Sequence, residues 1–599
     1  MSRTTGRRTR LIASLSVVAG LAAAGVVAGT AAPAQSDLPT GDCAVAFPVA
    51  DLTPGDDVTG LTVTHGTTPE GFTGSVLGVL EGGIGPDIDM VMVRLTSPVI
   101  DEIGIWQGMS GSPVYAANGD LIGAVAYGLA TGPSAVAGVT PFESMDDYLA
   151  EPAGRVAVDR ATARRIARHS DVGFAQARQG FEQLRMPIGV AGVGAARLAA
   201  AQRRADGHSW LPRSSYAVGR ASKDTASAAD IVAGGNLAAS LTYGDVTMAG
   251  VGTVTSVCGD RVVGFGHPMS FTGEATLGLH PADAIYIQDD LVAGFKVANI
   301  GDPVGTITDD RTAGIAGVLG ALPDTADLSI GLTHGADSRT GISHVADRTP
   351  DTLAWSTFYG VLADHQAVVD GPVKGSEDLA WTVTGTDGDG HPFSLSSGDL
   401  YASRSDLTYD LGFAVGDVVF ALAQIPGVTI DSVTTDSDLV DTVTTLTVSK
   451  VEARQGSTWV ELTRRSGLKV RAGHVLRTRV TLTDGSATSV VPANLHVPAT
   501  FSGRLAVLQV LGGSQASNGR MPRTIEDVQT WLDTLVRNDE LVVALTRGPR
   551  GHGPAGGAGT ASAPATPGRR GGGPRTVEAV VGPLDGVVKG RFFSVTTVR

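Results

Sequence analysis

The sequence has few of the residues on which several protein classes depend. Of its 599 residues only 5% are aromatic, 18% are charged and two are cysteine. Two thiols are too few for a thiolate zinc site, and the 12 histidines include no His-Glu-x-x-His motif, so we expect no metal centre. The formal net charge is −15 and no basic tract lies beyond the extreme N-terminus. A nucleic-acid partner is therefore excluded, because phosphate contacts need a concentrated cationic face.

Long apolar runs are also missing beyond residue 34, so we expect no integral membrane domain in the mature chain. At the N-terminus four arginines precede the apolar stretch 11–32, and small residues follow at 32–34. This order is typical of a secretory signal peptide over residues 1–34. The alternative is an uncleaved membrane anchor, although a stretch dominated by Ala and Gly makes a poor span. Both interpretations place the protein outside the cytoplasm, either secreted or at the cell surface.

Glycine, in contrast, is abundant, with 80 residues, and Val, Thr and Ala are frequent. This composition favours short strands joined by turns, and the length suggests three or four domains. We expect a mainly β protein with two barrel-like units, a helical connector, a mixed α/β region and an immunoglobulin-like sandwich. The expected boundaries are 1–34 for the signal peptide, 40–150 for the first β unit, 151–215 for the connector, 216–345 for the second β unit, 346–435 for the mixed region and 436–599 for the sandwich, which contains a flexible Gly/Ala/Pro-rich loop at 548–575.

The two cysteines, Cys43 and Cys258, both follow the expected signal peptide. In an oxidising compartment a disulfide between them is the economical interpretation, and it would close a very long loop. Two unpaired buried thiols are the alternative, because the sequence does not supply the Cα separation.

The segment Gly104–Tyr115, Gly-Ile-Trp-Gln-Gly-Met-Ser-Gly-Ser-Pro-Val-Tyr, carries the strongest chemical signal. A serine flanked by glycines on a tight turn presents its hydroxyl outward. The amides of Gly108, Met109 and Ser110 then point to one spot, as an acyl-transfer nucleophile with an oxyanion hole requires. Gly-Ser turns are common in β proteins, so the segment alone is also compatible with an ordinary turn.

The string Gly108-Met-Ser-Gly-Ser-Pro113, together with 123–128 and 137–141, resembles the SpoIVB peptidase family, the sporulation-type serine peptidases related to chymotrypsin-like proteases. The likeness covers residues 43–145 and, more loosely, 228–320. It implies that Ser110 is the nucleophile and Ser112 a bystander. The later Val263-Gly-Phe-Gly-His-Pro-Met269 is similar to the family's Gly-x-Gly-His strand end, which implies that His267 is the general base.

The order of these motifs departs from the family, in which the histidine precedes the serine. Two chymotrypsin-like barrels are therefore expected in swapped order, with a Cys43–Cys258 bridge between them. The third catalytic residue is ambiguous. Asp310 follows His267 at a separation similar to that in chymotrypsin-like enzymes, while Asp89 and Asp101 lie nearer the position that the family implies.

The resemblance predicts an exported serine-type endopeptidase that cleaves a limited set of protein substrates, the chain itself among the candidates. Ser110 would form an acyl-enzyme with His267 as general base, and no cofactor is needed. The alternative is a weakly active or inactive protease-like scaffold that acts as a secreted or surface binding protein. The distance between Ser110 Oγ and the nearest nitrogen of His267 distinguishes the two.

Overall fold

The structure is a computed structural model. It describes residues 43–599 except 130–131, 146–154, 157, 159, 171, 184–186, 213–214, 222–224, 291–293, 465–467, 517–518, 520 and 549–574. The expected signal peptide and nearly all of the expected loop at 548–575 thus lie outside the described residues. The described chain is mainly β, and it contains closed barrels, as the sequence predicts.

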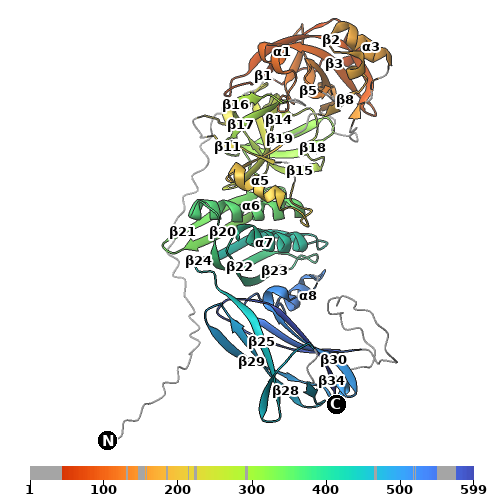
Figure 1. The fold of residues 1–599 in the computed structure, drawn as a ribbon. Helices are drawn as coiled ribbons and strands as arrows, with labels where there is room; N and C mark the ends of the chain where they lie inside the picture. The colour runs from red at the N-terminus through yellow and green to blue at the C-terminus, as the bar shows by residue number, and fades with distance from the viewer. Residues whose placement is uncertain are drawn as a thin grey trace. The chain divides into compact units, whose positions relative to one another are not determined.

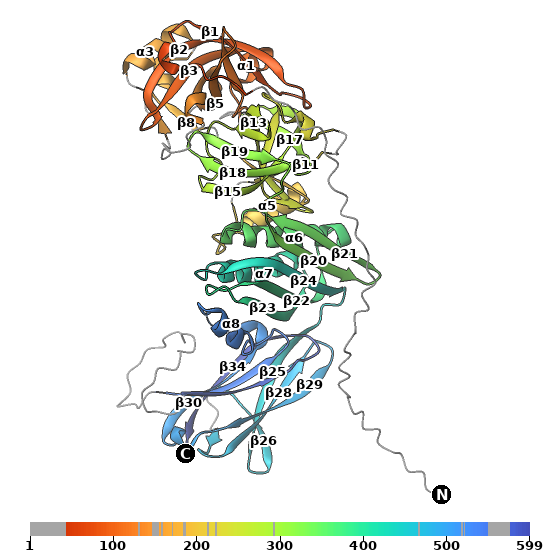
Figure 2. The same cartoon turned by 180° about the vertical axis from the view of Figure 1, so that it is seen from behind.

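The first β unit is a closed barrel of six strands (orange in Figure 1; seen from behind in Figure 2). Its strands pair in the order β4-β1-β2-β3-β6-β5, and β5 pairs back with β4. Alternate residues of β1 are buried, which is the period of two expected for a strand with one face on a core. The bounds are β1 (Asp57–Thr62), β2 (Glu70–Gly85), β3 (Ile88–Thr96), α1 (Pro98–Ile103), β4 (Pro113–Ala116), β5 (Leu121–Leu129), β6 (Val136–Pro141) and α2 (Phe142–Met145).

The connector is helical only in part. Three helices occur where helices are expected, but short strands separate them and extend the neighbouring sheets: β7 and β8 add to the first barrel's sheet through β5, and β9 and β10 add to the next sheet through β13. The bounds are β7 (Arg155–Val156), α3 (Arg160–His169), α4 (Phe174–Ala177), β8 (Phe181–Gln183), β9 (Ile188–Ala191), α5 (Ala195–Arg203) and β10 (Ser215–Ala217).

The second β unit contains another closed ring of strands, β13-β14-β19-β18-β15-β12, in which β12 pairs back with β13. A separate small sheet, β11-β17-β16, accompanies it. The bounds are β11 (Gly219–Arg220), β12 (Asn236–Gly244), β13 (Thr247–Cys258), β14 (Arg261–Gly264), β15 (Gly273–His280), β16 (Ala282–Gln288), β17 (Phe295–Ile300), β18 (Gly305–Arg311) and β19 (Gly314–Leu319).

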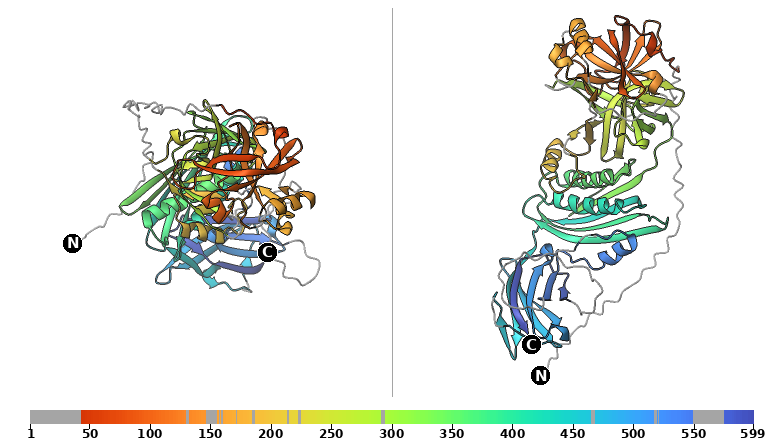
Figure 3. Two further views of the ribbon diagram at one scale, coloured as in Figure 1. Left: turned by 90° about the horizontal axis from the view of Figure 1, so that it is seen from above. Right: turned by 90° about the vertical axis from the view of Figure 1, so that its right-hand side faces the viewer.

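The hairpin 326–345, expected in the second β unit, pairs with that unit through β12 and with the mixed region through β24. Its strands continue the sheet in the order β21-β20-β24-β22-β23, and β20 pairs in parallel with β24. The helices α6 and α7 lie side by side over one face of this sheet (Figure 3, right). The bounds are β20 (Ala326–His334), β21 (Asp337–Val345), α6 (Pro350–Val369), β22 (Gly375–Thr386), β23 (Pro392–Ser403), α7 (Thr408–Ala423) and β24 (Thr429–Val440).

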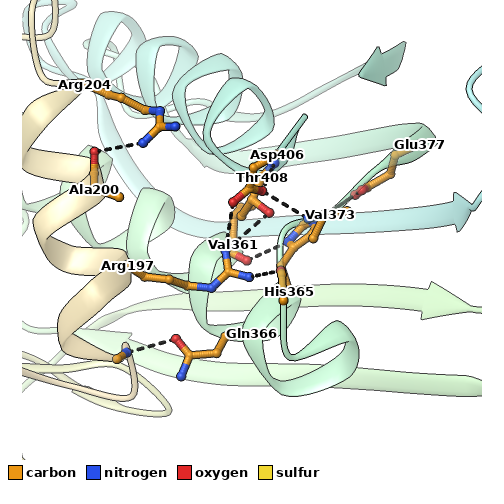
Figure 4. A network of polar contacts seen from close by, with 12 residues as sticks. Arg197, Ala200, Arg204, Val361, His365, Gln366, Val373, Glu377, Asp406 and Thr408 are labelled. Atoms are coloured by element: carbon orange, nitrogen blue, oxygen red, sulfur yellow. Dashed lines mark hydrogen bonds and ion pairs between the residues drawn. The ribbon is translucent and has the colours of Figure 1, made fainter. Parts of the chain in front are cut away.

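Polar contacts join the connector helix α5 to this region (Figure 4). The guanidinium of Arg197 donates to the carbonyl oxygen of Gly371 at 2.6 Å and lies 3.8 Å from the carboxylate of Asp406. At the start of α5, the amide of Gly194 donates to Oε1 of Gln366 at 3.0 Å. The helix is thus fixed to both α6 and the start of α7.

The C-terminal unit is a sandwich of two five-stranded sheets, β26-β25-β28-β29 with β33 beside β25, and β27-β34-β30-β31-β32. One core cluster contains apolar residues of both sheets. The helix α8 (Ile525–Leu532) begins after Thr524, whose side chain accepts the amide of Asp527. No helix of the described chain is both long and apolar enough to cross a membrane. The strand bounds are β25 (Thr445–Gln455), β26 (Thr458–Glu461), β27 (Lys469–Val470), β28 (Val475–Thr483), β29 (Thr488–His496), β30 (Arg504–Gly512), β31 (Leu541–Arg547), β32 (Thr576–Val581), β33 (Val587–Lys589) and β34 (Arg591–Val598).

Candidate active site between two barrels

Ser110 lies in the turn that joins α1 to β4, and two glycines give this turn its shape. Gly108 and Gly111 have φ values of +95° and +97°, which side chains rarely tolerate. A Cβ atom on Gly111 would also overlap the carbonyl oxygen of Thr253. The two glycines of the predicted nucleophile motif are therefore required by backbone conformation and by close packing.

Strand β13 of the second barrel holds this turn in place. The amide of Thr253 donates to the carbonyl oxygen of Ser110 at 2.8 Å, and its hydroxyl donates to the carbonyl oxygen of Gly108 at 3.1 Å. The hydroxyl of Thr255 donates to the carbonyl oxygen of Gly111 at 2.8 Å. The backbone that presents the serine is thus fixed by a strand of the other barrel.

His267 follows β14, where the chain turns sharply. Phe265 and Gly266 have φ values of +67° and +69°, and the carbonyl oxygen of Gly266 accepts the hydroxyl of Thr140, on β6, at 2.5 Å. This turn brings Nε2 of His267 to 2.9 Å from Oγ of Ser110, across 157 residues of sequence. The two residues that the motifs single out are in hydrogen-bond contact.

The other imidazole nitrogen fixes the tautomer. Nδ1 of His267 lies 2.7 Å from the carbonyl oxygen of Pro268, which only accepts, so Nδ1 carries the hydrogen. Nε2 then accepts the hydroxyl hydrogen of Ser110, as a general base requires. Both side chains are completely buried, and burial, opposed by the bond to Pro268, lowers the pKa of His267 to about 4. The imidazole is neutral at physiological pH.

Asp310, the first candidate for the third catalytic residue, has other partners. Its carboxylate accepts the amides of Met269, Ser270 and Phe271 at 2.7 to 2.8 Å. Burial raises the pKa of this carboxyl, and the amides oppose the rise. Asp310 therefore anchors the segment that follows His267, and the acceptor at Nδ1 is the backbone of Pro268.

The two alternative acids lie in the first barrel and bind local groups. The carboxylate of Asp89, on β3, accepts the amide of Gly82 at 2.8 Å. The carboxylate of Asp101, in the first turn of α1, accepts the hydroxyl of Thr96 at 2.9 Å. Each of these contacts fastens the start or the end of a strand.

The three amides of the predicted oxyanion hole differ in their hydrogen bonds. The amide of Met109 donates to the carbonyl oxygen of Trp106 at 3.1 Å and so closes the turn. The amides of Gly108 and Ser110 donate to no atom of the described residues. Of the three amides expected to form an oxyanion hole, that of Met109 is therefore engaged within the turn, and those of Gly108 and Ser110 have no acceptor among the described residues.

The predicted disulfide is present. Cys43 and Cys258 are joined with a Cα separation of 4.4 Å, which fastens the segment before the first barrel to the end of β13. The same segment is held on β5, since the amide of Phe47 donates to Leu121 at 2.9 Å and the amide of Leu121 donates to Val45 at 2.8 Å. The covalent link therefore joins the two barrels that carry Ser110 and His267.

A hollow lies beside the segment that Asp310 anchors. It has a volume of about 760 Å³, and Ser270, Thr272 and Asp309 are among the residues that line it. Ser110 and His267 do not line it.

Sequence reasoning missed the groups that complete this arrangement, namely the carbonyl of Pro268 and the hydroxyls of Thr140, Thr253 and Thr255. A backbone carbonyl has no sequence signature, and threonine is common throughout these strands.

Comparison of the chain with protein-family models, curated proteins and solved structures finds no match.

Proposed function

We propose that the protein is an exported serine-type endopeptidase. The observation that carries this proposal is the 2.9 Å contact between Oγ of Ser110 and Nε2 of His267, each presented by a glycine-containing turn of a different barrel. The N-terminal arginines and the apolar stretch of the sequence support export.

In the proposed reaction Oγ of Ser110 attacks the carbonyl carbon of a peptide bond while Nε2 of His267 takes the hydroxyl proton. The amides of Gly108 and Ser110 donate to the developing oxyanion. The imidazolium then gives its proton to the leaving amine, which leaves an acyl-enzyme on Ser110. Water, deprotonated by His267, attacks the ester and releases the acid and the free serine.

Burial of the site supports a restricted choice of substrates. Neither Ser110 nor His267 is exposed, so a protein substrate reaches them only when the enclosing turns move apart. A histidine with a pKa near 4 is also a weak base, which favours slow turnover. Regulated cleavage of a few proteins is compatible with both features, and general digestion is not.

The same burial favours a second candidate function, a secreted or surface binding protein built on a protease-like scaffold. The acceptor at Nδ1 of His267 is the neutral carbonyl of Pro268, and an ionised aspartate stabilises an imidazolium far better. In this alternative Ser110 and His267 are a buried structural pair.

Labelling with a fluorophosphonate probe distinguishes the two functions. We expect slow labelling of the oxidised wild-type protein, loss of labelling in Ser110→Ala, and at least a hundredfold slower labelling in His267→Gln. Ser240→Ala is the matched control, since Ser240 Oγ lies 2.7 Å from Nε2 of His280 in another fully buried pair, but on a regular strand. It should label like the wild type. A folded wild-type protein that is not labelled would support the binding scaffold.

A further inference from the structure

Lys296 is a buried lysine next to the candidate active site. It lies on β17, its residue is 2% exposed, and its Nζ donates to Oδ1 of Asn236 at 2.8 Å. Asn236 is equally buried, at 1% exposed. Burial of a lysine costs folding free energy, so a buried lysine indicates a role for its charge or for its packing.

The stem of this lysine packs against the turn that presents Ser110. The backbone amide of Lys296 donates to the carbonyl oxygen of Gln107 at 2.8 Å. A Cβ atom placed on Gly108 would lie 2.7 Å from Cβ of Lys296 and 3.7 Å from its Cδ. The stem that carries the ammonium is therefore in packing contact with Gly108, one of the two candidate oxyanion donors, and Nζ is two bonds beyond Cδ.

The partner of the ammonium is itself fixed between the two barrels. Nδ2 of Asn236 donates to the carbonyl oxygens of Gly66 and Ala282 at 3.0 and 2.8 Å. Gly66, in the first barrel unit, also exchanges two backbone hydrogen bonds with Ala284 on β16, at 2.7 and 2.9 Å. Lys296 is thus held on a rigid bridge between the turn of one barrel and the strands of the other.

We propose that Lys296 is a positioning residue for acyl transfer, whose stem fixes Gly108 and whose ammonium supplies positive charge behind the oxyanion amides. The proposal rests on the proposed peptidase function. In a buried site, a nearby positive charge acts on a developing oxyanion with less screening than at the surface.

The charge of this lysine changes within the physiological range, because burial lowers the pKa of Lys296 to about 7. Burial is the sole cause, with no contribution from a neighbouring charge. The titratable groups on the elements packed against Lys296 are Arg220 on β11, Tyr243 on β12, Asp283 and Tyr286 on β16, and His65 beside Gly66. The protonated form therefore predominates below pH 7 and the neutral form above it.

The test compares labelling rates of Ser110 in wild type, Lys296→Met and Lys296→Arg between pH 5 and 9. Methionine keeps a long apolar stem and removes the charge, and arginine keeps a charge throughout this range. We expect wild type to react about tenfold faster than Lys296→Met at pH 5.5, with the ratio falling towards one at pH 9. Lys296→Arg should lose the decline of labelling that wild type shows above pH 7. Lys374→Met, at an exposed lysine, should match the wild type throughout.

Each outcome decides the proposal. A ratio of wild type to Lys296→Met that stays constant from pH 5 to 9 would indicate packing alone and would overturn it, while leaving the peptidase intact. If Lys296→Met does not fold, Lys296→Arg decides instead. A labelling rate in Lys296→Arg that still falls above pH 7, as in wild type, would overturn the proposal. Absence of Ser110-dependent labelling in the wild type would overturn both this proposal and the proposed function.

Discussion

At the scale of single residues, the candidate site is made of ionisable groups that the fold has removed from water. His267 and His280 are both buried, both contact a serine through Nε2, and burial lowers the pKa of each to about 4. The motifs predicted the pairing of Ser110 with His267, because both segments carry glycine patterns. No motif indicated Lys296, because a single lysine in an apolar strand is normally predicted to be exposed to solvent.

The histidines predict a loss of stability in acid. The ordinary pKa of 6.5 holds for the unfolded chain, and the folded value is about 4, so unfolding takes up protons below pH 6.5. Each histidine then removes about 3 kcal/mol of unfolding free energy as the pH falls from 7 to 4. Urea unfolding at several pH values checks this.

The substitutions His267→Asn and His280→Asn should each reduce this acid-dependent loss. His496→Asn is the control, because this side chain is exposed and its removal should leave the pH dependence unchanged. If the wild type and all three variants show the same pH dependence of stability, the two buried histidines are not the cause of the acid-dependent loss.

At the scale of elements, turns and helices differ in how far the sequence reveals them. The turn at Gly104–Pro113 was predictable because its glycines follow a recognisable spacing. The longest helix, α6, was missed because residues 352–365 are all buried and no polar face marks the helical period. The hairpin β20–β21 joins strands of the second β unit and of the mixed region in one sheet, and this pairing was not predictable because alternation shows that a strand exists and does not show its partner.

Gly111 allows a sharp test of the turn. Gly111→Ala places a methyl group on the carbonyl of Thr253 at a φ of +97°, so we expect a loss of several kcal/mol of stability and no labelling of Ser110. Gly119→Ala is the matched control, because Gly119 has a φ of +91° and nothing within 4 Å of the added atom. It should cost only about 1–2 kcal/mol and should keep labelling. Equal effects of the two substitutions would show that packing against β13 is unimportant.

At the scale of the whole molecule, the two barrels are united by a disulfide, by strand β13 and by the bridge through Asn236. The sequence predicted the β-barrels from strand spacing, and it predicted the disulfide from the oxidising compartment that the N-terminal segment leads us to expect. The hydrogen bonds between the barrels were not predictable, because most of them use backbone groups.

Removal of the disulfide tests the link between the barrels. Cys43 and Cys258 are separated by 215 residues, and the chain-entropy estimate for such a loop is about 5 kcal/mol. The variant Cys43→Ser/Cys258→Ser should therefore unfold at lower urea concentration and should label faster, because Ser110 becomes more accessible. A reducing agent should have the same effect on wild type and none on the variant. Unchanged labelling would mean that access does not depend on separation of the barrels.

The order of the two barrels also has a consequence for the timing of biosynthesis. A chain made from its N-terminus completes the barrel with Ser110 well before the segment with His267 has been synthesised. During that interval Ser110 lacks its contact with His267, and β13, whose hydrogen bonds hold the turn of Ser110, has not yet been synthesised. Under the proposed function, a chain in that interval has the serine but not the histidine, so acyl transfer begins only after the second barrel has folded onto the first.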